Sequence, residues 1–199
     1  MTHVGASPER DRLLNLVVDL ILREGVIDLS LSAVARKISS NNRMLLYYFG
    51  SKEALLDEAS VRAFERFPRL RDLFDRLAEP GDIEDRLFRA WDDLSADDNL
   101  PYLRLYFQRF GIAMREVDGW GGLLERAGYY WSDRIHAQLR SDGFDDAISR
   151  TVARAVVALW RGMQIMLLSG APREELTQAY RFSVGGLVAQ LRSGTPAAV

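Results

Sequence analysis

One stretch of this chain, residues 30–52, constrains its fold more than any other: S-L-S-A-V-A-R-K-I-S-S-N-N-R-M-L-L-Y-Y-F-G-S-K. Its apolar residues recur at helical spacing on both sides of a polar break; they are Leu31, Val34, Ala35 and Ile38, then Leu45, Leu46 and Phe49. We expect Ser30 to cap the first helix. The break consists of residues that hydrogen-bond their own backbone and so favour turns, namely Ser39, Ser40, Asn41 and Asn42. Two short helices joined by a tight turn are the outline of a helix-turn-helix.

The charge of this stretch indicates an anionic partner. Arg36, Lys37, Arg43 and Lys52 lie between Asp28 and Glu53 with no acid among them, although the whole chain has a formal charge of −2. Tyrosines and asparagines interleave with these cations and offer donors that suit phosphates and base edges. The alternative is an ordinary surface helix pair with solvated basic residues. The pattern favours DNA binding.

The residues of this stretch resemble the DNA-binding signature of the TetR family of bacterial repressors. The resemblance covers about the first sixty-five residues; its most specific part is Y-Y-F-G-S-K-E-A-L at 47–55, preceded by V-A-R-K-I and N-N-R-M-L. The chain departs from the family pattern at several positions. Ser39 replaces the usual turn glycine, Asn41 a frequent serine and Arg43 a frequent small residue, and Leu46 replaces a tyrosine that usually touches a phosphate.

The resemblance implies that the second helix of the motif reads double-stranded DNA. We expect Asn41, Asn42, Arg43 and Met44, which open that helix, to meet base edges, and Lys52 to touch a phosphate. A non-glycine residue at the turn costs roughly 1 kcal/mol if its φ is positive. The full set of candidate DNA contacts is Ser32, Arg36, Asn41, Asn42, Arg43, Met44, Tyr47, Tyr48 and Lys52.

Nothing in the rest of the chain predicts a strand, and the whole is expected to be all-α, with nine or so helices. Ser7-Pro8-Glu9 starts the first helix through a capping hydroxyl and a first-turn proline, and Gly25 stops it. A helix capped by Ser51 and ending near Pro68 connects to helices expected at 69–78, 83–94, 101–117, 123–141, 146–169 and 174–191. The expected domains are a helix-turn-helix domain at 1–50, a connecting helix at 51–66, a helical effector-binding and dimerisation domain at 67–192, and a flexible tail at 193–199.

Composition limits the chemistry. The chain has no cysteine, which excludes disulfides and thiolate sites, and only two histidines, His3 and His136, which excludes a histidine-rich metal cluster. It has no phosphate-cradling glycine loop and no G-x-S-x-G, so we expect no catalytic residues, no cofactor and no metal. The N-terminus lacks a signal-peptide pattern, and the longest apolar tract is interrupted by Arg161 and Gln164. A cytoplasmic protein that does not enter a membrane is the expectation.

Residues 146–169 are apolar almost all the way round the expected helix, which therefore needs cover on more than one side. Two interpretations remain open: both C-terminal helices are central in a monomer core, or they form a four-helix interface with a second copy. The family resemblance favours a homodimer.

Bulky aromatic residues concentrate between positions 91 and 160. Such residues are usually plain core, but with nearby methionines they could equally line an apolar cavity for a small-molecule effector. The candidate lining residues are Tyr106, Phe110, Trp131, Trp160 and Met163. The interpretation is a dimeric repressor, released from a palindromic operator by an apolar or amphipathic ligand. The alternatives are a DNA-binding regulator controlled by a protein partner and an enzyme on a helical scaffold.

Overall fold

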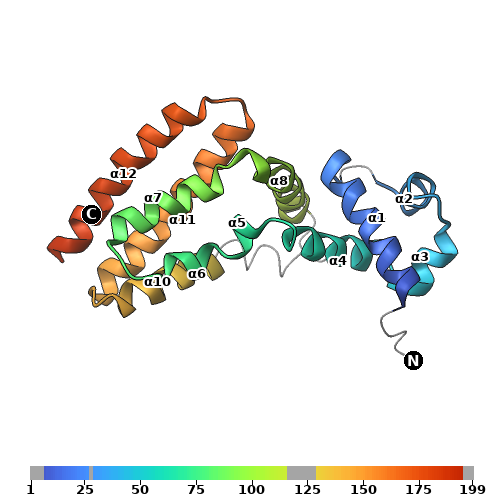
Figure 1. The fold of residues 1–199 in the computed structure, drawn as a ribbon, viewed down its shortest axis with the longest axis horizontal. Helices are drawn as coiled ribbons and strands as arrows, with labels where there is room; N and C mark the ends of the chain where they lie inside the picture. Colours follow the sequence, from blue (N-terminus) through green and yellow to red (C-terminus); the bar gives the residue numbers. More distant parts are fainter. Residues whose placement is uncertain (1–6, 27–28, 116–128, 195–199) are drawn as a thin grey trace. The chain divides into compact units, whose positions relative to one another are not determined.

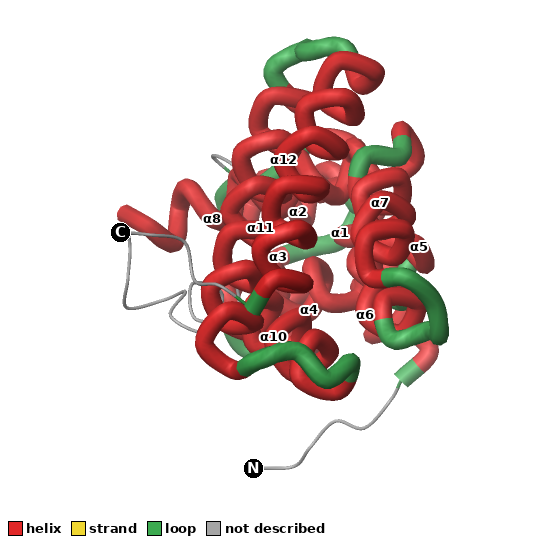
Figure 2. The backbone as a smooth tube through the Cα atoms, turned by 90° about the vertical axis from the view of Figure 1, so that its left-hand side faces the viewer, coloured by secondary structure: helices red, strands yellow, loops and turns green. Residues whose placement is uncertain are grey.

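The computed structural model describes residues 7–26, 29–115 and 129–194. Every regular element in these ranges is an α-helix, apart from one 3-10 turn, η1, at Asp97–Asn99 and a π turn at 129–130 (Figure 2). The all-α expectation is confirmed. The chain divides into two compact units, which we call the first unit (Met1–Phe67 with Pro101–Gly119) and the second unit (Pro68–Leu100 with Trp120–Val199).

The first unit contains α1 (Pro8–Glu24), α2 (Leu31–Lys37), α3 (Asn42–Phe49), α4 (Lys52–Phe64) and α8 (Leu100–Arg115, from Pro101 onward), all shown in Figure 1. One apolar cluster joins them, and α8 contributes to it through Leu105, which is 1% exposed. The fully buried members from the other helices are Leu13, Leu14, Val17, Val18, Val34, Leu55, Ala59 and Ala63. The boundary predicted at residue 67 assigns α8 to the later domain, whereas its packing groups it with the first helices.

The second unit contains α5 (Pro68–Arg71), α6 (Leu73–Leu77), α7 (Ile83–Leu94), α10 (Trp131–Ser141), α11 (Asp146–Leu168) and α12 (Arg173–Ser193). In it α11 packs against both α10 and α12 (Figures 1 and 2). Tyr180 lies at the centre: its hydroxyl accepts from Trp160 Nε1 at 2.8 Å and donates to the Leu87 carbonyl at 3.0 Å. Trp91 stacks on the same ring at 5.2 Å between centroids. Burial raises the pKa of Tyr180, because the phenolate would lose its hydration.

Side-chain caps form at the starts of α2, α3 and α4, and the sequence predicted two of them, Ser30 and Ser51. Ser30, Asn41 and Ser51 each accept a hydrogen bond from the backbone N–H three residues later, at 3.0–3.1 Å. Ser7 occupies the N-cap position of α1 with extended backbone, but its side chain makes no capping hydrogen bond, so that expectation is wrong. The proline at the first helical position is present as expected.

One expected helix is divided in the structure. The single helix expected at 69–78 is two helices, α5 and α6, because the backbone of Asp72 between them departs from helical geometry, with φ −94° and ψ 10°. Residues 97–99, between α7 and α8, form the turn η1. Of the helix expected at 123–141, residues 123–128 lie outside the described residues, and α10 begins at Trp131.

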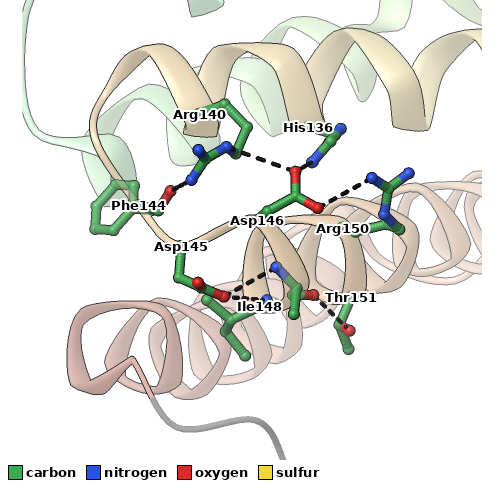
Figure 3. A network of polar contacts seen from close by, with 9 residues as sticks. His136, Arg140, Phe144, Asp145, Asp146, Ile148, Arg150 and Thr151 are labelled. Atoms are coloured by element: carbon green, nitrogen blue, oxygen red, sulfur yellow. Dashed lines mark hydrogen bonds and ion pairs between the residues drawn. The ribbon is translucent and has the colours of Figure 1, made fainter.

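The corner between α10 and α11 is closed by a polar network centred on Asp146 (Figure 3). Its carboxylate accepts from Arg150 at 3.1 Å and contacts His136 Nε2 at 3.0 Å and Arg140 Nε at 3.5 Å. Arg150 and His136 lower the pKa of Asp146, and the hydrogen bond from Arg150 has the larger effect. Asp145 caps α11 through the N–H groups of Ala147 and Ile148.

One helix of the described part of the chain, α11, is long and apolar enough to cross a membrane by length and composition alone. Buried core helices also meet that criterion.

Candidate nucleic-acid interface

The turn between α2 and α3 has the geometry that the sequence predicts, with serine in a backbone conformation that favours glycine. Ser39 has φ +55°, the only positive value among the non-glycine residues that the structure describes. Ser40 N–H donates to the Ala35 carbonyl at 2.8 Å, which closes the turn behind α2. A left-handed serine costs about 1 kcal/mol or somewhat more, because its Cβ crowds the following carbonyl.

The two helices bury one side and expose the other. Val34, Ala35, Ile38, Leu45 and Phe49 are all less than 9% exposed and belong to the core of the first unit. Leu46 is different: it was expected on this apolar face, but it is 46% exposed. Adjacent helical residues are about 100° apart, so packing Leu45 inward turns Leu46 toward the outer side.

The predicted contacts on the outer side of the motif fall into two groups. The exposed ones are Ser32, Arg36, Asn41, Asn42, Arg43 and Tyr47, whereas Met44, Tyr48 and Lys52 are half-buried. Asn42 Nδ2 donates to Ser32 Oγ at 2.8 Å and so ties the start of α3 to α2. Asn41 uses its side-chain carbonyl to cap α3. Both asparagines therefore also position the helix, a role that the sequence interpretation did not assign to them.

The basic cluster carries less unpaired charge than the sequence indicates. Lys37 Nζ pairs with Glu24 from α1, and Lys52 Nζ lies 3.8 Å from Glu53 Oε1. Within the part of the chain that the structure describes, Arg36 and Arg43 make no ion pair. These two guanidinium groups carry the unpaired positive charges of the motif.

Arg10 of α1 supports the far end of α3, and nothing in the sequence of the motif signals this. Its guanidinium makes two hydrogen bonds to Glu58 of α4, at 2.7 and 2.6 Å. It also lies over the ring of Phe49, 4.9 Å from the centroid. A paired, stacked arginine thus holds α1, α3 and α4 together.

Helix α8 supports the same unit from the other side. Gln108 Oε1 accepts from the Val26 N–H at 3.0 Å. A Cβ at Gly25 would lie 2.1 Å from that oxygen, and Gly25 has φ +80°, so a larger residue would be strained and would displace the Gln108 amide. Arg109 of α8 also pairs with Asp57 of α4. The sequence predicted Gly25 as a helix stop but not its contact with α8.

Comparisons with known proteins address the fold. No protein-family model matches the chain, and no curated protein sequence matches it either. Solved structures do match. Salmonella enterica GusR aligns over 94% of this chain and 98% of its own, with a TM-score of 0.71 and 17% identity. A TetR-like transcriptional regulator from Rhodococcus sp. aligns over 96% and 99%, with a TM-score of 0.64 and 19% identity.

The multidrug binding protein EbrR, solved with imidazole, covers 98% of both chains with a TM-score of 0.66 and 22% identity. The chain has the TetR-family fold. The expectation drawn from residues 34–35 and 47–55 is thereby confirmed for the fold, including its helix-turn-helix and the helical region that follows.

The predicted effector residues of this TetR-like chain divide between the two units. Tyr106 and Phe110 lie on α8 of the first unit, half-buried and stacked at 6.2 Å between centroids. Trp131, Trp160 and Met163 lie in the second unit, where Trp131 meets Trp160 edge-on at 6.0 Å. Trp160 is fully buried and its indole N–H is bound by Tyr180, so it is also a structural core residue.

Gln164, a polar residue that interrupts the longest apolar tract of the sequence, follows Trp160 by four residues on α11. Gln164 is fully buried; its Oε1 accepts from Arg161 at 3.2 Å, and its Nε2 has no hydrogen-bond partner among the described residues. Arg161 lies over Trp131, 4.3 Å from the ring centroid. A buried amide donor without an acceptor costs about 1–3 kcal/mol, so this position favours an incoming acceptor. The described residues contain no group of three or more potential ligands that could hold a metal.

Proposed function

We propose that this chain is a TetR-like transcriptional regulator, acting as a repressor, that inserts α3 into the major groove of a double-stranded operator. The single observation that carries the proposal is the outward face of α3. On it Arg43 is exposed and unpaired within the described residues, beside Asn42, Leu46 and Tyr47. Each class of side chain needed for groove recognition is present: a fork of donors, an amide and an apolar contact. The match to regulators of this fold supports it.

We propose that the regulator is a homodimer joined through α11 and α12. Three large apolar residues of these helices are exposed: Ile165 by 51%, Met166 by 52% and Phe182 by 87%. Gly162 and Gly186 are also exposed, and a Cβ at either would meet no atom within 4 Å. Small residues beside large ones permit close helix approach, and a two-fold dimer requires an operator that is an inverted repeat.

We propose that a small apolar or amphipathic ligand controls DNA binding. In the second unit, Trp131, Trp160 and Met163 supply apolar surface, and Gln164 supplies a buried donor. Tyr106 and Phe110 remain candidate lining residues from the sequence. Ligand-bound structures of this fold, with imidazole in EbrR and choline in a regulator from Saccharomonospora viridis, support a ligand-binding role.

The DNA proposal is tested by selecting fragments of the chain's own genome that bind the purified full-length protein. We expect an enriched inverted repeat whose half-sites lie about one helical turn apart. An Arg43→Ala variant, still folded by circular dichroism, should not enrich that repeat. If the wild-type protein enriches no sequence, the regulator proposal is wrong.

The effector proposal is tested on that operator. A true effector should lower operator affinity at least about tenfold, because shifting a two-state equilibrium needs a large difference in affinity for the two states. Trp131→Ala should blunt the response and leave ligand-free DNA binding intact. Operator binding that responds to a protein from the cell extract but to no small molecule would favour the protein-partner alternative.

We propose that the protein works in the cytoplasm, where the operator would be.

A further inference from the structure

A role in the fold alone does not explain the exposure of the Leu46 side chain. Its neighbour Leu45 is 1% exposed and belongs to the core of the first unit, whereas Leu46 is 46% exposed on the outer side of α3. Single exposed leucines are common on protein surfaces. This one lies within the candidate nucleic-acid interface, three residues after Arg43 and four after Asn42.

The spacing of Arg43 and Leu46 places both on one face of α3. Three residues advance an α-helix by about 4.5 Å and by about 300° of rotation, so the two side chains project within about 60° of each other. Successive base pairs of B-DNA are about 3.4 Å apart. A helix that sets Arg43 against one base pair therefore sets Leu46 against an adjacent one.

The chemistry of the major groove leaves one good partner for an isobutyl side chain. Guanine, adenine and cytosine present acceptors and amino groups, which leucine cannot satisfy, and thymine alone adds a 5-methyl group. We propose that Leu46 is a specificity-determining residue that packs on the thymine methyl of the base pair next to the one that Arg43 reads. The inference rests on the proposed DNA-binding function and extends it to the sequence of the half-site.

The methyl group itself can be removed without changing any hydrogen bond. Replacing one thymine at a time by deoxyuridine in both half-sites of the selected operator deletes only the 5-methyl groups. Loss of one buried methyl corresponds to about fourfold in affinity, hence roughly fifteenfold for two half-sites. We expect the affinity of the wild-type protein to fall by about that factor at one thymine position. That thymine should lie next to a guanine whose replacement weakens binding of the wild-type protein but not of Arg43→Ala.

Leu46→Ala identifies the side chain responsible. Because Leu46 is nearly half exposed and lies outside the apolar core, the variant should keep its helical circular dichroism and unfolding midpoint. It should bind the thymine and deoxyuridine operators equally, at about the affinity of wild type for the deoxyuridine operator. Val61→Ala is the matched control, since Val61 is also an exposed aliphatic residue of the first unit, at 61%, but lies on α4. It should respond to deoxyuridine as wild type does.

Two results would overturn the inference while leaving the regulator proposal in place: specific operator binding that is indifferent to every deoxyuridine substitution, or a deoxyuridine effect that persists unchanged in Leu46→Ala. Failure of the genomic selection to enrich any sequence would instead reject the regulator proposal itself, and this inference with it.

Discussion

Two surfaces of this molecule expose large apolar side chains, and they differ in what surrounds those side chains. On α3, Leu46 and Tyr47 lie beside Arg43 and Asn42. On α11 and α12, Ile165, Met166 and Phe182 accompany exposed Gly162 and Gly186. Polar donors with a cation suit the edges of bases and phosphates, whereas glycines and apolar residues suit another helix. Exposed apolar area alone therefore does not identify a partner; the neighbouring side chains do.

The largest effect is expected from a substitution that alters only the surface on α11 and α12. Gly186→Trp fits the subunit's own fold, because a Cβ there meets nothing within 4 Å, but it would block close approach of a second copy. We expect sedimentation to show monomers and operator affinity to fall at least about 100-fold, because two linked half-site contacts become independent. The control is Ala137→Trp on α10, which is equally exposed and should remain dimeric. A wild-type protein that is monomeric at micromolar concentration would contradict the proposed interface.

The second effect concerns the surface on α3. Arg43→Ala should lower affinity for the selected operator by about 1–3 kcal/mol, as expected for a bidentate contact to guanine, and barely change affinity for scrambled DNA. Arg43→Lys keeps the charge but loses the planar fork. If Arg43 reads a base, the lysine variant should bind the operator as weakly as the alanine variant does. If Arg43 serves only as a charge, the lysine variant should bind the operator as tightly as wild type does. Filter-binding titrations on both duplexes measure this.

A smaller effect tests whether Lys52 contacts DNA phosphates regardless of the base sequence. Lys52→Ala should weaken binding to all duplexes alike and reduce the slope of log K against log salt by about 1. The other lysine, Lys37, is the matched control, because its ammonium group is already paired with Glu24. Lys37→Ala should change the slope less. Equal slopes for Lys52→Ala and wild type would remove Lys52 from the phosphate contacts.

The smallest effect concerns the turn that presents α3. Ser39→Gly should raise the free energy of unfolding by up to about 1 kcal/mol, because glycine adopts φ +55° without strain, offset in part by its greater unfolded-state entropy. Ser40→Gly, in the same turn but without a positive φ, should give no such gain. Urea unfolding compares the two variants. Operator affinity should be unchanged in Ser39→Gly, and a decrease would show that the strained turn itself positions α3.

Local interactions explain what the sequence by itself determined. Caps at Ser30 and Ser51, helical apolar periodicity and a polar break are contained within a few residues of chain, and they correctly predicted an all-α fold with a helix-turn-helix at its start. The split between α5 and α6 was missed, because it lies in the backbone angles of a single residue, Asp72.

Only the tertiary structure decided which side of each helix packs against other helices of the chain. Periodicity allowed both Leu45 and Leu46 on an apolar face, and packing of the first unit buried one and exposed the other. The contact of Gln108 with Val26 joins residues 82 positions apart, and Arg10 reaches Glu58 across 48. Such pairings depend on how whole helices pack, which no local pattern encodes. The structure thus placed α8 with the first helices and left Arg43 and Leu46 facing outward from α3.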